Sequence, residues 1–239
     1  MPLELIIPLG AFLASFVVAA AGFGDALVLG AIWFQFVDPI DAVPLIVACG
    51  LTMHTFPLFK LRHELDYSKL PIFAVAGLLG VPLGAWLLTH TEPTPFRLGI
   101  GWFLITYVAF IFAVPKGLIL KRVGRVADSS VGFLGGVLGG FAGLSGVIPT
   151  LWVGLLGWTK ERQRGVYQPF CLIMHAITLV WLSWQGLVSA DTLERYLWCF
   201  PAIIIGSWLG LIIYRKLNEK IFRQLILGLI LVSGLALIV

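Results

Sequence analysis

Two glycine-containing breaks interrupt apolar stretches of this chain and carry side chains that could hold a solute. The first break is Gly22-Phe23-Gly24-Asp25, and the second is Gly143-Leu144-Ser145-Gly146. Lipid cannot satisfy the backbone groups that a break frees, so a break at membrane depth is tolerated only inside protein or beside a water-filled cavity. Glycine-interrupted segments at corresponding places in two related halves are the best sequence indication of a transporter's binding site. We therefore expect the breaks to bind substrate.

Each break should be followed by a short helix, and we expect these half-helices at about 25–37 and 145–158. The first turn of a helix exposes unpaired N–H groups and the positive end of the helix dipole. Two converging N-termini could therefore bind an anion without a buried lysine or arginine. This suits the chain, because no Lys or Arg lies in the middle of an apolar stretch. The alternative interpretation is that both breaks are only packing kinks.

Asp25 is the one acidic residue expected within the membrane, where ionisable side chains are costly and usually functional. It could instead be the N-cap of the half-helix that follows it. As a carboxylate it would compete with an anionic substrate unless it is protonated. Two roles therefore stay open for Asp25, a helix cap and a proton or cation site. Ser145, at nearly the same place in the second half, is a neutral cap and a hydroxyl donor.

Two histidines occupy matching positions, since His54 and His175 are 121 residues apart, as are Gly22 and Gly143. Histidine can donate to an anion or transfer a proton near neutral pH, or it can join two helices by a hydrogen bond. We expect their helices to be antiparallel, with one histidine toward each side of the membrane. Gln168 could add an amide donor. The predicted substrate site comprises Gly22, Phe23, Gly24, Asp25, His54, Gly143, Leu144, Ser145, Gly146, Gln168 and His175.

The composition excludes a soluble domain. Of 239 residues, 59% are hydrophobic and 12% are charged, whereas soluble proteins average roughly 25% charged residues. The net charge of +4 lies in the loops and indicates topology, not a nucleic-acid partner. The chain should be an all-α integral membrane protein, with half-helices in the second, sixth and seventh of its apolar runs. These runs are at about 3–21, 25–37, 40–60, 70–89, 96–114, 129–142, 145–158, 164–186, 193–214 and 221–238.

An internal duplication supports this layout. After the matched glycines and histidines, two further pairs of segments align at an offset of 126 residues: Gly80–Gly84 with Gly206–Gly210, and Phe96-Arg97 with Phe222-Arg223. The glycines four residues apart in these segments should let helices pack closely. We predict a first transmembrane repeat at 1–114, a basic linker at 115–127 and a second repeat at 128–239.

Basic loops orient the two repeats. Lys and Arg cluster at 60–69, 115–127, 160–164 and 215–220, while the connections near Asp38, Glu92 and Asp191 carry few basic residues. Because basic loops tend to face the cytoplasm, matching helices should run in opposite directions. The halves would then be inverted-topology repeats, with the linker in the cytoplasm, both termini outside and the site near the midplane.

The chain resembles the sulfite exporter TauE/SafE family of bacterial membrane permeases over nearly its whole length. The resemblance rests on its size, its duplicated hydrophobic layout, the two glycine breaks and Pro149 after the second break. It implies a permease or exporter that moves sulfite or an organosulfonate across the bacterial cytoplasmic (inner) membrane. The partners expected are this small anion and the lipid bilayer, with a homodimer left open and no cofactor, metal or nucleic acid.

One alternative belongs to another class of protein. Gly143-Leu144-Ser145-Gly146 also resembles the nucleophile motif of rhomboid intramembrane serine proteases, and His175 could be the general base for Ser145. The first break, however, has Gly24 where the second has the serine. A catalytic dyad does not need a duplicated break, whereas a two-fold transport site does. We therefore expect a transporter and not an enzyme.

Overall fold

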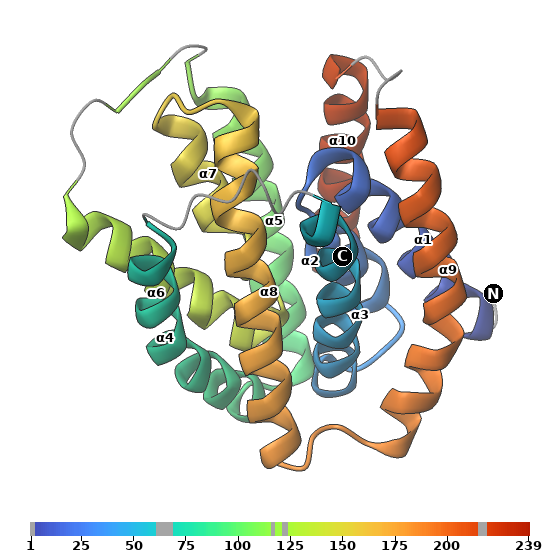
Figure 1. Cartoon of the computed structure of the whole chain (residues 1–239). Helices are drawn as coiled ribbons and strands as arrows, with labels where there is room; N and C mark the ends of the chain where they lie inside the picture. The colour runs from blue at the N-terminus through green and yellow to red at the C-terminus, as the bar shows by residue number, and fades with distance from the viewer. Residues whose placement is uncertain (1–2, 61–68, 116–117, 121–123, 215–218) are drawn as a thin grey trace.

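The computed structural model describes residues 3–60, 69–115, 118–120, 124–214 and 219–239, and these residues form ten α-helices (Figure 1). The prediction of an all-α protein is confirmed. The helices are α1 (Leu3–Ala21), α2 (Asp25–Trp33), α3 (Pro39–Lys60), α4 (Leu70–His90), α5 (Pro93–Ala113), α6 (Arg125–Ala142), α7 (Val147–Leu155), α8 (Lys160–Trp184), α9 (Ala190–Tyr214) and α10 (Glu219–Ile238).

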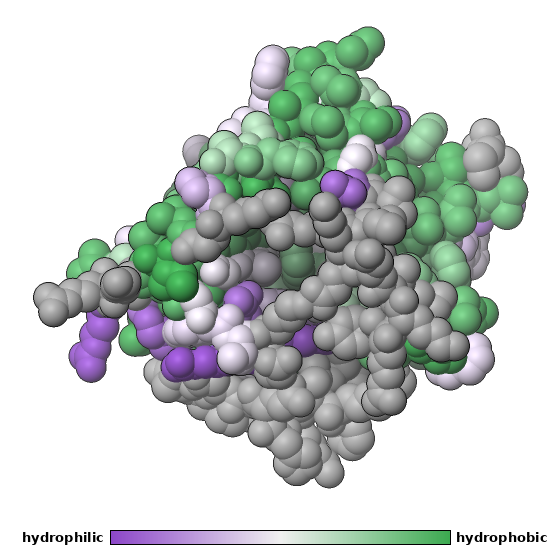
Figure 2. Space-filling view, turned by 90° about the horizontal axis from the view of Figure 1, so that it is seen from above, coloured by the Kyte–Doolittle hydropathy of each residue, from purple (hydrophilic) through white to green (hydrophobic). Residues whose placement is uncertain are grey.

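Five helices of the described chain are long and apolar enough to cross a membrane: α1, α4, α5, α8 and α9. Shorter apolar segments lie in α3 and α10. Large hydrophobic side chains such as Leu79, Phe112 and Val180 face outward on these helices, and hydrophobic residues reach the surface over much of the described part (Figure 2). Lipid, and not water, suits such a surface. The protein is therefore a multi-pass membrane protein.

Both breaks interrupt the helices as expected. Gly22, Gly24 and Gly143 have φ angles of 85°, 103° and 74°, which are left-handed conformations that glycine adopts without a steric penalty. The helices that follow, α2 and α7, have 9 residues each. At 1.5 Å per residue each is about 14 Å long, roughly half the bilayer core. The half-helices are confirmed, although they end at Trp33 and Leu155 and so are shorter than predicted.

The sixth apolar run is not a half-helix, which corrects the prediction. α6 has 18 residues and begins at Arg125, inside the segment predicted to be a linker. Its first turns are polar, so the hydropathy pattern did not include them in the predicted run. Even so, the buried Asp128 is ion-paired with Lys69, at 2.7 Å between Nζ and Oδ2, and accepts a hydrogen bond from Trp152 Nε1. These contacts hold the polar end of α6 in the helix bundle.

α4 packs along α6, and glycines allow the two backbones to approach (Figure 1). A Cβ atom at Gly80 would collide with the carbonyl oxygen of Phe133, and one at Gly84 would collide with that of Val137. Only glycine fits at such a distance, which confirms the predicted packing role of the two residues.

α1 packs along α9 in the same way. A Cβ atom at Gly206 would lie 2.5 Å from the carbonyl oxygen of Phe12, and one at Gly210 would lie 2.5 Å from that of Phe16. Phe12 and Phe16 each precede their counterparts on α6 by 121 residues. In both pairs, a helix from one half of the chain therefore packs against a helix from the other half.

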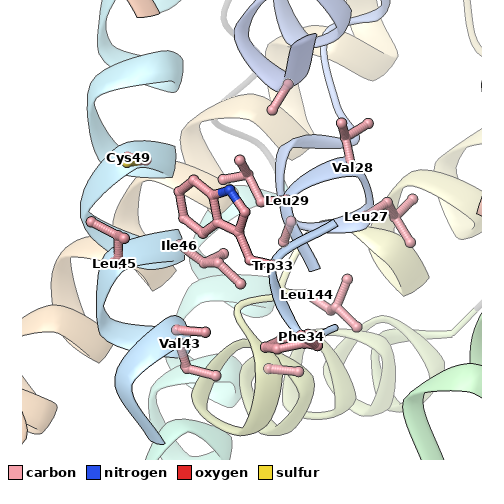
Figure 3. Close-up of a cluster of buried hydrophobic side chains, with 14 of the residues drawn as sticks. Leu27, Val28, Leu29, Trp33, Phe34, Val43, Leu45, Ile46, Cys49 and Leu144 are labelled. Atoms are coloured by element: carbon pink, nitrogen blue, oxygen red, sulfur yellow. The ribbon is translucent and has the colours of Figure 1, made fainter. Parts of the chain in front are cut away.

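α2 lies in the centre of the molecule, with its residues from Asp25 to Ala31 and Trp33 all buried. Its apolar side chains meet those of α3, including Ile46 (Figure 3). Leu144, from the second break, belongs to the same cluster. The core thus holds the two breaks close together.

Residues 61–68 and 215–218 of the basic loops, and 116–117 and 121–123 of the predicted linker, lie outside the described residues. The orientation of the chain in the membrane, and with it the inverted topology, therefore stays a prediction.

Candidate functional site

α3 and α8 pack against each other and bring the two histidines together. The ring centroids of His54 and His175 are 5.5 Å apart, so the expectation that they lie toward opposite sides of the membrane is wrong. The helices meet at the histidines because Gly50, one turn before His54, leaves room for α8. A Cβ atom at Gly50 would collide with the ring of His175 and lie 2.6 Å from Asp25 Oδ2.

Asp25 accepts the hydrogen bond that joins the first break to this histidine pair. Its Oδ2 atom is 2.7 Å from His175 Nε2 and 3.4 Å from His54 Nε2. The three residues are at most 6% exposed. The N-cap of α2 is Gly24, with no side-chain cap, so Asp25 is not the helix cap that one interpretation made it. Its carboxylate instead faces two buried imidazoles.

Ser145 brings the second break to the other edge of the same imidazole. Its Oγ atom lies 3.4 Å from His175 Nδ1, and both residues are buried. Gly139 makes room for this arrangement, since a Cβ atom there would be 3.0 Å from the Ser145 side chain. His175 therefore contacts the first break through Nε2 and the second break through Nδ1.

Residues of the first break also face the start of α8. Phe23 packs edge to face on Tyr167, at 6.2 Å between ring centroids. A Cβ atom at Gly22 would lie 3.1 Å from Arg164 Nε, and this nitrogen donates to Gln168 Oε1 at 2.9 Å. Gln168, which was predicted to add an amide donor to the site, thus lies beside the first break.

The other predicted residues of the second break are packed against neighbouring side chains. Leu144 is buried in the apolar core. A Cβ atom at Gly146 would lie 2.6 Å from Cys171 Sγ, and one at Gly143 would lie 2.7 Å from Ile46. These residues shape the break, while Ser145 supplies its polar side chain.

Two residues of the site were missed in the sequence. Gly50 precedes His54 by four residues and so shares its helix face, a spacing that could have marked it. Arg164 was assigned to a basic loop and was not included in the predicted substrate site. It precedes Gln168 by four residues, and Cys171 and His175 continue the same helical spacing.

The site geometry argues against a serine protease. In a catalytic triad, Nε2 of the histidine faces the serine and Nδ1 faces the aspartate. Here the ring is reversed, because Nδ1 faces Ser145 and Nε2 faces Asp25. Ser145 is also fully buried.

Asp25, His54 and His175 each offer one potential metal ligand, and these atoms lie within 4.8 Å of one another. Two ligands of a tetrahedral zinc ion are about 3.3 Å apart, given metal–ligand bonds of about 2.0–2.2 Å. The distance of 2.7 Å between Asp25 and His175 is shorter and is that of a charge-assisted hydrogen bond. The two side chains are therefore hydrogen-bonded directly to each other, with the imidazole N–H donating to the carboxylate.

Several spanning helices and two broken helices that meet in the protein interior define the class of a membrane transporter. Comparison with known protein families supplies the particular family. The sulfite exporter TauE/SafE family matches residues 7–237, so the chain belongs to this family. Its members are transporters and not enzymes, which removes the protease alternative. No curated protein and no solved structure gives a significant match to the chain.

Proposed function

We propose that this protein is a secondary transporter of a small oxyanion of the sulfite or organosulfonate class, which binds where the two helix breaks meet. One observation carries the proposal: His175 lies 2.7 Å from Asp25 of the first break and 3.4 Å from Ser145 of the second. A solute at this point touches both halves of the chain, as alternating access requires.

The helix N-termini supply the attraction for an anion. Neither Gly24, the N-cap of α2, nor Gly146, the N-cap of α7, makes a side-chain cap hydrogen bond. No side-chain cap therefore competes with a ligand at either helix end, although the first N–H of α7, that of Val147, donates to the carbonyl oxygen of Leu144 at 3.4 Å. Each helix end carries about half a positive charge. An oxyanion has several acceptor oxygens for such donors.

The histidines offset the charge of Asp25. An ionised carboxylate would repel the substrate, but protonation of His175 makes the pair neutral. His54 Nε2 lies 3.4 Å from the same carboxylate oxygen, so a proton on His54 would add a second positive charge beside Asp25. Proton binding by this cluster therefore favours an anion.

The two halves act as inverted repeats that move against each other. In support of this, Gly80 and Gly84 on α4 meet α6 as Gly206 and Gly210 on α9 meet α1, with partners 121 residues apart. The repeats correspond to 1–114 and 128–239, with the start of α6 reaching back into 115–127. The protein works in the bacterial cytoplasmic membrane, and the basic loops face the cytoplasm.

The test is binding and flux of sulfite and methanesulfonate, measured by thermal shift and in proteoliposomes. Gly22→Leu and Gly143→Leu place a side chain in each break and should abolish both signals. Gly99→Leu is the control, since a Cβ atom there would meet nothing within 4 Å.

Ser145→Ala is a milder change that removes only a hydroxyl. It should weaken binding about tenfold, the loss of one good hydrogen bond to a charged group. Normal transport by Ser145→Ala and both leucine variants would show that the breaks are packing kinks.

A further inference from the structure

One buried face of α8 is polar along much of its length. Arg164, Gln168, Cys171, His175 and Thr178 are spaced by four, three, four and three residues, so they lie on one side of the helix. The last four are at most 1% exposed, and Arg164 is half-buried. A helix normally turns its apolar face toward the protein interior, so this face needs another explanation.

Two atoms on this face have no hydrogen-bond partner, Gln168 Nε2 and Thr178 Oγ1. Leaving a buried polar group without a partner is costly, and native proteins seldom do it without a functional reason. The two atoms lie on either side of His175 along the helix. Their placement suits a solute that moves along this face.

Arg164 stands at one end of the polar face, beside the first break. Its Nε donates to Gln168 Oε1 at 2.9 Å, and its Nη2 donates to the carbonyl oxygen of Ala19 at 3.5 Å. Both of these acceptors are neutral. An arginine has five N–H donors, and its planar fork suits oxyanions.

We infer that Arg164 and Gln168 form a second anion site, which receives the substrate before it reaches the breaks at His175. The inference rests on the proposed function and adds to it a binding site and a route. Arg164 supplies a full positive charge, and Gln168 Nε2 supplies a buried donor that has no hydrogen-bond partner. These are the groups that recognise a sulfite or sulfonate head.

The two sites lie at different depths along α8. Arg164 precedes His175 by 11 residues, which is about 16 Å along a helix, or roughly half the bilayer core. The backbone of Arg164 would thus lie near one membrane surface and His175 near the midplane, while the Arg164 side chain reaches Gly22 at the start of the first break. In the predicted orientation this surface is cytoplasmic, where an exporter collects its substrate.

The first test compares Arg164→Gln with Arg162→Gln. Arg162 is exposed two residues away, with its guanidinium 4.2 Å from the centroid of the Trp158 ring, so both variants lose the same charge near the same surface. In proteoliposomes, Arg164→Gln should raise KM for sulfite and methanesulfonate about tenfold or more, as expected for lost charge-assisted hydrogen bonds. Arg162→Gln should leave KM within about twofold, as surface charges contribute little.

The second test is Gln168→Leu, which separates a binding role from a structural one. Leucine removes the unpartnered Nε2 donor and also the Oε1 atom that accepts from Arg164 Nε. Removing an orphan donor offsets the loss of one hydrogen bond, so the thermal stability should change little. If Gln168 binds the anion, KM rises while the melting temperature is kept or increased. A lower melting temperature with an unchanged KM would show that Gln168 is structural and would overturn the site.

The outcomes also separate the two proposals. Wild-type protein that transports neither anion would refute the proposed function, and the inference with it. Wild-type transport with an unchanged KM in both Arg164→Gln and Gln168→Leu would refute only the second site. If KM rises equally in Arg164→Gln and Arg162→Gln, the loss of surface charge explains the rise, and the second site is refuted as well.

Discussion

Replacing His175 by glutamine should remove most of the pH dependence of anion binding. His175 joins Asp25 of one break to Ser145 of the other, and in its protonated form it adds a full positive charge to a site otherwise served by helix dipoles. An anion then binds the protonated state more tightly, and by linkage it promotes proton uptake. Affinity for an anion of fixed charge should therefore rise as the pH falls. Glutamine keeps a hydrogen-bond donor for Asp25 but cannot titrate.

The size of the effect follows from the geometry. An anion that accepts a hydrogen bond from Ser145 Oγ would have its charge about 6 Å from the His175 ring, because Oγ itself is 3.4 Å from Nδ1. One added charge at this distance contributes about 3 kcal/mol at an effective dielectric constant of about 20. Since about 1.4 kcal/mol is a factor of ten, the affinity should change by about 100-fold between the two plateaus. Within the transition the slope cannot exceed tenfold per pH unit for one proton.

Calorimetry of the purified protein with methanesulfonate, from about pH 5.5 to about pH 8, measures this directly. A sulfonate keeps its charge over the whole range, whereas sulfite titrates and would confuse the result. His175→Gln should bind at all pH values nearly as the wild type binds at high pH. His90→Gln is the matched control, because His90 is exposed and stacks on Trp86, so it should leave the dependence intact.

Asp25→Asn and His54→Gln complete the experiment. Asn removes the carboxylate that accepts the hydrogen bond from His175, so it should flatten the dependence, whereas a simple cap would leave it unchanged. His54→Gln should reduce it, since His54 Nε2 is 3.4 Å from the same carboxylate oxygen. Equal pH slopes in the wild type and in all three site variants would refute the reasoning and leave the helix dipoles as the only source of attraction.

Three further predictions test the helix packing and the topology. Gly50→Ala should abolish flux without removing any polar group, because the new methyl group displaces the buried imidazole and carboxylate beside it. Gly99→Ala is the control and should transport normally, and full activity of Gly50→Ala would contradict the site geometry. Gly84→Leu should destabilise the protein by about 1–3 kcal/mol through overpacking, seen as a lower melting temperature in detergent, whereas an unchanged value would show that α4 does not press on α6. Single cysteines introduced at 115–127 and 187–192 should be labelled from opposite sides of the membrane, and labelling from the same side would remove the inverted repeat.

The sequence alone determined the membrane architecture. Hydropathy and the positions of glycines can be read from neighbouring residues alone. Lipid requires every spanning helix to satisfy its own backbone hydrogen bonds, wherever the helix lies in the fold. The breaks after Ala21 and Ala142, the short helices beyond them and the close packing at Gly80 and Gly206 could therefore be predicted. The sixth run was misjudged because α6 begins with polar residues, whose burial depends on a distant partner, Lys69.

Only the tertiary structure decided how the site is assembled. Matched positions in the sequence did not show that His54 and His175 would face one carboxylate, because that depends on the point at which α3 and α8 cross. The crossing point follows from Gly50, whose missing side chain admits the ring of His175 and the carboxylate of Asp25. The role of Arg164 was likewise hidden, because a basic residue near a membrane surface has the same signature whether it sets topology or binds an anion. The neighbours on which our inference for Arg164 rests come from α1 and the first break, about 140 residues earlier in the chain.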